Sequence, residues 1–267
     1  MSEIDVISHT DEPISKEDLI RDFKALGLQQ DDHVILHVSL SKIGWIIGAE
    51  VTLIKALQEV LLHGTIVMAT QTGQLSNPRR WENPPVPSTW HDKIIKHMPY
   101  YEQDLTPPYQ LGRVAQLFYK MQNVYRSNHP ASSFSAWGHY AKALTETHSI
   151  SPAFGDGSPI EFMRKHQFKV LSIGTSYDTM TVLHYAETKK PQAKKITQMY
   201  FVNDGNNQTH ILEVEDIDYD TQDFLSIGEG FEQSHTFKRG KIGQATTTLI
   251  PVNELIESAI QYFNQRP

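Results

Sequence analysis

The chain has 267 residues, of which 39% are hydrophobic and 21% charged, a composition typical of a folded globular protein. With 24 basic and 31 acidic residues the net charge is −7, and no basic cluster of the kind that nucleic-acid binding requires is present. The absence of cysteine excludes disulfides, thiolate nucleophiles and cysteine-ligated metals, whereas 13 histidines direct attention to imidazole chemistry. The polar start and the lack of a long apolar run predict a single-domain (1–267) cytoplasmic protein without a membrane span.

The first third of the chain alternates helical and strand patterns. Residues 1–12 are expected to be frayed, and Ser15 with Asp18 three residues later then predicts a capped helix that ends at Gly27. Apolar runs predict buried strands at 34–36 and 65–70, and an apolar stripe predicts a helix at 49–62 between them. This order of strand, helix and strand favours parallel pairing.

The middle of the chain is less regular. Residues 71–109 are rich in proline and lack periodicity, which predicts a long loop on the surface or beside a cleft. Helices are expected at 111–121 and 140–147, on either side of the polar stretch 125–138.

The last third again alternates strands and helices. Ser158-Pro159 is a cap and first-turn signature for a helix to His166, followed by a strand at 168–173 and a helix at 179–188. Strands at 196–202 and 208–214 flank the turn sequence N-D-G-N-N, and a strand at 245–250 precedes a helix at 252–263. The predicted fold is a layered α/β/α arrangement. Its central sheet is mixed and largely parallel, helices flank the sheet, and an antiparallel hairpin lies in the C-terminal half.

Two polar segments could bind a ligand. His37–Trp45 lies between a strand and a helix and offers Ser39, Ser41 and Gly44, and such turns face the ligand edge of open α/β sheets. The alternative is a serine-rich turn that satisfies its own backbone. Residues 126–138 are also dense in polar groups, and the alternative there is a capped loop with His129 on the surface.

A third segment could carry proton transfer. His184 and Glu187 are three residues apart on a predicted helix, and a carboxylate beside an imidazole orients the ring for general-base work. An ordinary surface pair is the alternative. No H-E-x-x-H motif or nearby second histidine completes a zinc site, so no metal is expected.

A fourth segment is acidic, with six carboxylates between residues 213 and 223. A concave patch of this kind would bind an ammonium-rich ligand or orient a histidine from elsewhere, and the alternative is a solvated loop. The sequence contains no G-x-S-x-G elbow, no Walker A loop and no convincing dinucleotide fingerprint.

Four segments in order carry a resemblance that covers roughly residues 15–263. They are H-V-S-L-S-K-I-G-W at 37–45, R-S-N-H-P-A-S-S-F-S-A-W-G at 126–138, G-D-G-S-P at 155–159 and T-V-L-H-Y-A-E at 181–187, and the acidic E-V-E-D-I-D segment follows. Together they resemble the aminoglycoside N(3)-acetyltransferase family, whose members use acetyl-CoA and are distinct from the GNAT acetyltransferases.

The resemblance implies direct transfer of an acetyl group from acetyl-CoA to an amine within a ternary complex. His184 would be the general base, oriented by Glu215, which is slightly preferred, or by Glu187. The residues implied in binding coenzyme A are His37, Ser39, Ser41, Gly44, Trp45, His129, Ser132, Ser133 and Gly138.

The acceptor implied is a cationic amine, namely the 3-amino group of an aminoglycoside or a related amino sugar. The residues expected to line its pocket are Thr72, Asp178, Thr181, Glu213, Asp216 and Asp218. Two other classes stay open: a CoA- or amino-sugar-binding homologue without catalysis, and a metal-dependent hydrolase that uses some of the histidines. A homodimer is possible, and the proline-rich segment is expected to form a wall of the acceptor cleft.

Overall fold

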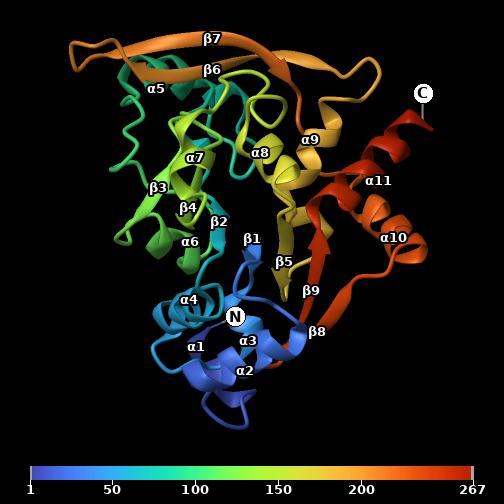
Figure 1. Cartoon of the computed structure of the whole chain (residues 1–267). Helices are drawn as coiled ribbons and strands as arrows, with labels where there is room; N and C mark the ends of the chain where they lie inside the picture. Colours follow the sequence, from blue (N-terminus) through green and yellow to red (C-terminus); the bar gives the residue numbers. More distant parts are fainter. Residues whose placement is uncertain (1, 266–267) are drawn as a thin grey trace.

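The computed structural model describes residues 2–265 and consists of a seven-stranded sheet between two layers of helices, with a separate two-stranded hairpin (Figure 1). The sheet order is β3-β4-β2-β1-β5-β9-β8. Only the three central strands are parallel: β1 pairs in parallel with β2 and β5, and the outer strands pair antiparallel. The predicted α/β/α fold is confirmed. The strands of the sheet are β1 (His33–Val38), β2 (Thr65–Ala69), β3 (Val124–Arg126), β4 (Phe134–Gly138), β5 (Lys169–Ile173), β8 (Lys238–Ile242) and β9 (Ala245–Pro251).

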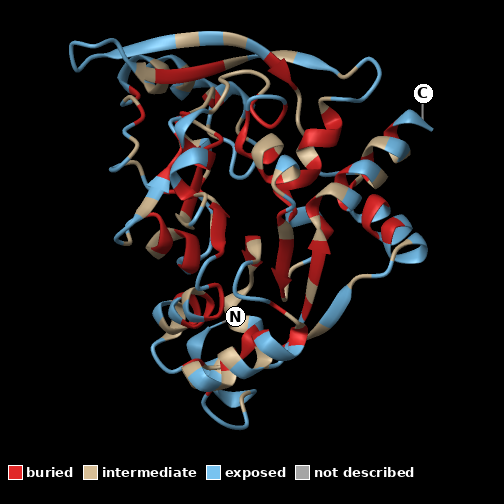
Figure 2. Ribbon diagram, viewed as in Figure 1, coloured by how far each residue is buried: buried red, intermediate tan, exposed pale blue. Residues whose placement is uncertain are grey.

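Successive side chains of the central strands point alternately into two separate hydrophobic cores, and these strands are therefore apolar on both faces. Val34 and Leu36 of β1 point into one core and Ile35 into the other. Figure 2 shows buried residues along the strands of the sheet and on parts of the helices that cover it. The first core is covered by α2 (Lys16–Leu26), α4 (Ala49–Val60) and α6 (Arg113–Phe118). The second is covered by α7 (Ala141–Glu146), α8 (Pro159–Lys165), α9 (His184–Glu187), α10 (Phe224–Ser234) and α11 (Val252–Asn264).

Two helices begin at the capping residues that the sequence predicts. Ser15 accepts a hydrogen bond from the Asp18 amide and the Asp18 carboxylate bonds back, which completes a capping box at α2, and Gly27 ends the helix in the left-handed conformation. Ser158 caps α8, with Pro159 in the first turn.

Several segments differ from the sequence-based expectation. The start of the chain, which was expected to be frayed, contains helix α1 (Glu3–Ser8). The Trp45 indole donates a hydrogen bond to the Glu3 carboxylate and so connects this helix to the turn after β1. The proline-rich segment contains α5 (His91–His97) and three 3₁₀ turns (Gly73–Leu75, Pro78–Arg80 and Ser88–Trp90). The expected helix at 179–188 is shorter, because the 3₁₀ turns Tyr177–Thr179 and Thr181–Leu183 precede α9. A four-residue helix, α3 (Leu40–Ile43), follows β1.

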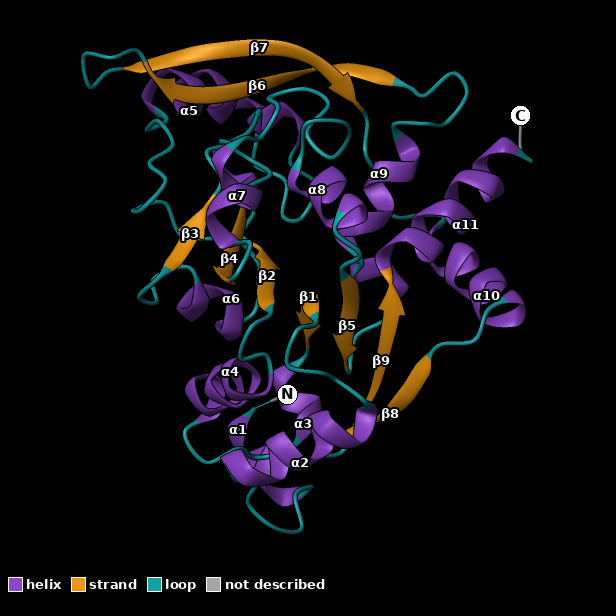
Figure 3. Ribbon diagram, viewed as in Figure 1, coloured by secondary structure: helices purple, strands orange, loops and turns teal. Residues whose placement is uncertain are grey.

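The hairpin formed by β6 (Lys195–Asn203) and β7 (Thr209–Ile217) is not part of the main sheet. Figure 3 shows it as a long ribbon that lies across one end of the molecule, beside α5. Met199 and Phe201 of β6 pack with Leu75, Met98 and Tyr101, so the hairpin has a small core of its own with the proline-rich segment. This placement puts the middle of β6 above the edge of the sheet at which the parallel strands end.

Candidate active site

The parallel order of β2, β1 and β5 brings the segments that follow them to one edge of the sheet. These segments are Ser39–Gly44 after β1, residues 70–76 after β2 and residues 174–188 after β5. Residues 129–133 join them because β4 starts at this edge, with Phe134 opposite Ala69. Three of the four polar segments that the sequence singled out therefore meet at this edge, and residues 220–222 of the fourth line the same site.

His184 and Glu187 form a hydrogen-bonded pair at this edge. His184 Nδ1 lies 2.5 Å from Glu187 Oε2, and Glu187 Oε1 accepts a hydrogen bond from the Asp220 amide at 3.0 Å. Since a carboxylate only accepts hydrogen bonds, Nδ1 carries the hydrogen, and in the neutral imidazole Nε2 then has the lone pair. Nε2 makes no hydrogen bond to any residue between 2 and 265. Glu187 is 6% exposed, so it is held behind the imidazole and out of solvent.

Aromatic rings hold the imidazole in place. Phe154 stacks on His184 with ring centroids 4.9 Å apart, and Tyr219 and Phe224 contact the ring at 5.5 Å and 4.9 Å. The Tyr219 hydroxyl donates to Asp216, whose other carboxylate oxygen accepts from the Ala153 amide. Burial, and then the Asp216 charge, raises the pKa of Tyr219, so this phenol stays neutral and is a fixed wall.

His184 opens into a cavity of about 630 Å³, which we call the His184 cavity. Its walls come from the segment after β2, from residues 131–132, from the middle of β6 and from residues 219–222. Most residues of the wall are uncharged: they include four glutamines (Gln71, Gln110, Gln198 and Gln222), the aromatic residues Tyr109, Phe154, Tyr200 and Tyr219, and the hydroxyl residues Ser76, Ser132 and Thr221.

A second cavity, of about 580 Å³, lies beside the turn after β1, and we call it the Trp45 cavity. Ser39, Ser41, Gly44 and Trp45, four of the residues that the resemblance implies in coenzyme binding, line it. Ser39 precedes α3 but its side chain forms no cap, so its hydroxyl is available to a ligand. Arg113 brings a positive charge to the same wall while pairing with Glu50 at 3.0 Å.

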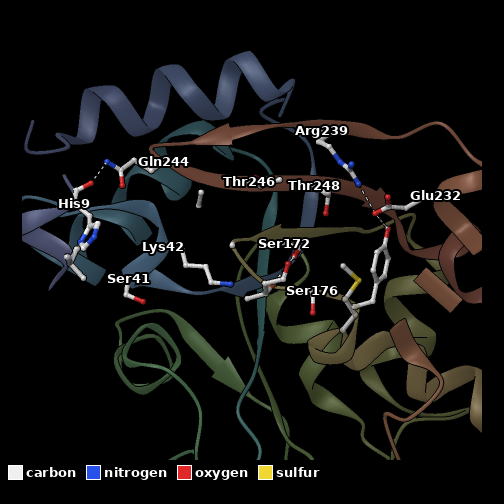
Figure 4. A pocket seen from close by; sticks show the side chains of 16 residues that line it. His9, Ser41, Lys42, Ser172, Ser176, Glu232, Arg239, Gln244, Thr246 and Thr248 are labelled. Carbon is white, nitrogen blue, oxygen red and sulfur yellow. Dashed lines mark hydrogen bonds and ion pairs between the residues drawn. The ribbon is translucent and has the colours of Figure 1, made fainter. Parts of the chain in front are cut away.

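A third cavity, of about 640 Å³, lies on the other side of Ser41, and we call it the Lys42 cavity (Figure 4). Lys42 and Arg239 reach it from α3 and β8, and Ser172, Ser176, Thr246 and Thr248 supply hydroxyls. The Glu232 carboxylate accepts hydrogen bonds from Arg239 at 2.6 Å and from the Tyr177 hydroxyl at 3.2 Å, so the arginine charge is already paired.

Four of the residues predicted to bind the coenzyme take other roles in the structure. His129, 0% exposed, accepts hydrogen bonds at Nδ1 from the Ala131 and Ser132 amides, and Nε2 donates to the Ile150 carbonyl. Both of its nitrogens are therefore used by the backbone. Burial, followed by His148, lowers its pKa to about 3, so it is a neutral structural residue.

The other three are likewise not at a cavity wall. Ser133 donates to the Thr70 carbonyl and accepts from Arg126, inside the protein. Gly138 lies at the opposite end of the sheet, opposite Thr65, where a side chain would meet the Gly64 carbonyl. His37 is buried, which lowers its pKa to about 4, and its Nε2 has no hydrogen-bond partner. Ser132 is the one residue of the segment 126–138 in our coenzyme set that reaches the His184 cavity.

The expected partner Glu215 is not the carboxylate behind His184. The register of the hairpin places Glu215 opposite Thr197 on the solvent side, where its side chain is 67% exposed and pairs with Lys195. The preference for Glu215 is therefore wrong, and the structure pairs His184 with Glu187, the alternative.

None of the six residues predicted to line the acceptor pocket lines the His184 cavity. Thr72 is fully buried and donates to the Pro130 carbonyl, and Asp216 is buried against Tyr219 and backbone amides. Asp218 pairs with Arg80 and Lys194. The remaining three lie elsewhere: Asp178 is exposed beside Ser176, Thr181 is buried in a 3₁₀ turn, and Glu213 is exposed on β7.

Sequence analysis missed most of the cavity wall, above all Gln198 and Tyr200 of β6 and Tyr109 of the proline-rich segment. The one local signal was the expectation that the segment 71–109 lies on the surface or beside a cleft, and Tyr109 of that segment lines the cavity. Among residues 2–265, no group of three or more histidine, cysteine, aspartate or glutamate side chains is placed to hold a metal ion. The helices in this range also include none that is long and apolar enough to cross a membrane.

Comparisons with known proteins identify the family to which this chain is similar. Residues 35–264 match the family model described as aminoglycoside 3-N-acetyltransferase. The SPbeta prophage-derived aminoglycoside N(3')-acetyltransferase-like protein YokD of Bacillus subtilis (strain 168) is 35% identical over 97% of this chain and 95% of its own. Its crystal structure superposes with a TM-score of 0.95, covering 99% of both chains.

Two further relatives extend this result. Aminoglycoside N(3)-acetyltransferase IX of Micromonospora chalcea is 27% identical over 100% of this chain and 99% of its own. AAC-VIa, solved bound to sisomicin, has a TM-score of 0.85 and 25% identity, covering 96% of this chain and 99% of its own. The family match spans most of the chain and includes both the turn at Ser39–Trp45 and the His184 pair, and the chain therefore belongs to the aminoglycoside 3-N-acetyltransferase family, whose activity is acetyl-CoA-dependent acetylation.

Proposed function

We propose that the protein transfers the acetyl group of acetyl-CoA directly to an amine bound in the His184 cavity, with His184 as general base. The amine would belong to an aminoglycoside or a related amino sugar, as the family membership and the sisomicin-bound relative suggest. The observation that carries the proposal is the imidazole whose Nδ1 is held by buried Glu187 while Nε2 opens into a cavity large enough for a substrate.

The chemistry follows from this pair. An ammonium group has no lone pair, so the amine must lose a proton before or as it attacks the acetyl carbon. In the proposed step the acceptor is already the neutral amine, its ammonium proton having gone to solvent: the new carbon–nitrogen bond forms, the carbon–sulfur bond breaks, the remaining proton that the nitrogen loses passes to Nε2, and the thiolate of CoA leaves. Glu187 stabilises the imidazolium that results and keeps the ring in the productive tautomer.

Residues 129–133 support the same step. The Ser132 hydroxyl lines the His184 cavity and makes no hydrogen bond to another described residue, so it is available to stabilise negative charge on the acetyl oxygen. Its position is fixed because its amide donates to His129. We assign the oxyanion-stabilising role to this hydroxyl.

The coenzyme is assigned to the Trp45 cavity. The free Ser39 hydroxyl in the turn after β1, and the Arg113 guanidinium that also pairs with Glu50, suit a pantetheine chain and phosphates. Calorimetry tests the assignment: Trp45→Ala should weaken CoA binding strongly, whereas Arg239→Ala, in the Lys42 cavity, should leave it unchanged. The reverse pattern would move the coenzyme to the Lys42 cavity.

The reaction is tested by measuring release of free CoA from acetyl-CoA with a panel of aminoglycosides and amino sugars. His184→Ala should lower kcat by roughly 10²–10⁴-fold, the usual contribution of a general base. CoA binding and the thermal midpoint serve as controls for folding. Unchanged kcat in the variant would remove His184 from the role, and CoA binding without turnover of any amine would indicate a non-catalytic binding protein.

A further inference from the structure

The walls of the His184 cavity carry little charge. Among the residues that line it, Glu82 and Asp220 are the acidic ones, and no lysine or arginine is present. Aminoglycosides with four or five ammonium groups would need more carboxylates than this, because an ammonium removed from water without a negative partner costs free energy. A cavity with two carboxylates can neutralise two such groups.

Neutral amides take the place of further carboxylates. The side chains of Gln71, Gln198 and Gln222 line the cavity and form no hydrogen bond to another residue within 2–265, and Gln110 uses its amide only toward the Asn83 carbonyl. A glutamine amide both donates and accepts, so it matches sugar hydroxyls and N-acetyl groups. Three such amides around one cavity form a surface suited to a neutral polar ligand.

Three nearby carboxylates of the acidic segment 213–223 do not add negative charge to the cavity, because they interact with other residues. Lys195 pairs with Glu215, and Arg80 and Lys194 pair with Asp218. Asp216 is buried and bonded to Tyr219. These three carboxylates therefore do not line the cavity, although they are adjacent to Asp220 in sequence.

We propose that the acceptor is an amino sugar with one or two amino groups among several hydroxyl or amide groups, and that polycationic aminoglycosides are poor ligands. This inference rests on the proposed function, since it treats the His184 cavity as the acceptor site. The volume of about 630 Å³ lies within the range of small-molecule sites and accommodates two sugar rings. Glu82 and Asp220 hold the ammonium groups, and the glutamines bind the neutral remainder.

A disaccharide series of constant shape tests the proposal. N,N′-diacetylchitobiose has no amine, its mono-deacetylated form has one and chitobiose itself has two, while kanamycin and sisomicin provide the polycations. Binding to the CoA-loaded protein is measured by calorimetry, so the result does not depend on turnover. The one- and two-amine disaccharides should bind about tenfold tighter than either polycation, which corresponds to roughly 1.4 kcal/mol.

Variants of one wall residue sharpen the test. Gln198→Glu adds a carboxylate to the cavity and should shift the affinity ratio about tenfold toward kanamycin, whereas Gln198→Ala should weaken the disaccharides without helping kanamycin. Glu213→Gln removes a carboxylate from the exposed side of the same hairpin and should leave the ratio unchanged. A Gln198→Glu protein with the wild-type ratio would contradict the assignment of this residue.

Each result is separable from the fate of the proposed function. Tighter binding of kanamycin or sisomicin than of the disaccharides, or no binding of any disaccharide, would overturn the inference, whether or not CoA is released. Preferential disaccharide binding without acetyl transfer would support the inference about the ligand while contradicting the catalytic proposal.

Discussion

Two histidine regions lie at the same edge of the sheet, and they differ in what the ring nitrogens contact. Both ring nitrogens of His129 form hydrogen bonds, with backbone groups of its own loop and of Ile150, and burial lowers its pKa to about 3. In His184 only Nδ1 forms a hydrogen bond, to a buried carboxylate, and Nε2 faces a cavity. Burial among aromatic rings is common to both histidines. An unused nitrogen that faces a space, with a carboxylate behind it, distinguishes a candidate base from a structural residue.

The largest effect after loss of His184 itself is expected for Glu187→Gln. Glutamine preserves the size of the side chain but can donate to Nδ1, which favours the wrong tautomer, and it removes the charge that stabilises the imidazolium. We expect kcat to fall roughly 10²-fold or more. The measurement is steady-state CoA release, with CoA affinity as the control, and a wild-type kcat would show that the pair is only structural.

His129 offers two complementary substitutions. Asparagine keeps an acceptor near the Ala131 and Ser132 amides but loses the donor to Ile150, whereas glutamine reaches Ile150 and leaves the two amides unpaired. A buried unpaired group costs about 1–3 kcal/mol, so His129→Gln should be the less stable variant in urea unfolding. It should also lose more kcat, because Ser132 is no longer held. Equal, wild-type activity of both variants would contradict this role for His129.

Buried neutral histidines also predict a pH dependence of stability. Burial lowers the pKa of His37 and of His148 to about 4 and that of His129 to about 3, whereas an unfolded histidine has a pKa of about 6.5. Below pH 6.5 the unfolded chain therefore binds protons that the native chain does not, and stability falls as the pH falls toward 4.

Each of these histidines contributes up to about 1.4 kcal/mol per pH unit in that window. Urea unfolding at several pH values between 5 and 7 measures the slope. His129→Asn should lower the slope by about one proton. A slope that is the same in the variant would mean that His129 titrates normally in the native protein.

The smallest effect is expected for Glu215→Ala. Its carboxylate makes an exposed pair with Lys195, and such pairs contribute little to stability. Activity and thermal midpoint should match the wild type. A large loss of kcat would place Glu215 at the site after all and would contradict the pairing of His184 with Glu187.

Much of the fold could be predicted because local signals dominate in its central elements. The apolar strands, the capped helices at Ser15 and Ser158 and the hairpin turn were all visible in the sequence. Strands β3 and β4 were not assigned, since they carry Arg126 and Ser135, polar residues that are buried in a network with Thr70 and Ser133. Helix α10 was missed because Gly228 lowers its helix propensity. There Tyr177 packs so closely that a side chain would collide.

The site was predictable only where its residues are neighbours in sequence. The spacing of His184 and Glu187 is local, and it correctly offered their pairing. Register and long-range contacts decided the rest: Glu215 faces solvent because of its place opposite Thr197, while Gln198, one position along, lines the cavity. No pattern within β6 shows which of its faces meets a site built from β2 and α9.

The separate hairpin has a consequence for how this protein could diversify. The proton-accepting pair is part of the main α/β/α core, while Gln198 and Tyr200 come from a two-stranded unit outside the seven-stranded sheet. Replacement of the half-buried Gln198 would therefore alter the choice of acceptor without disturbing the reaction centre. Evolution, or a library restricted to this position, could explore new acceptors at small risk to folding.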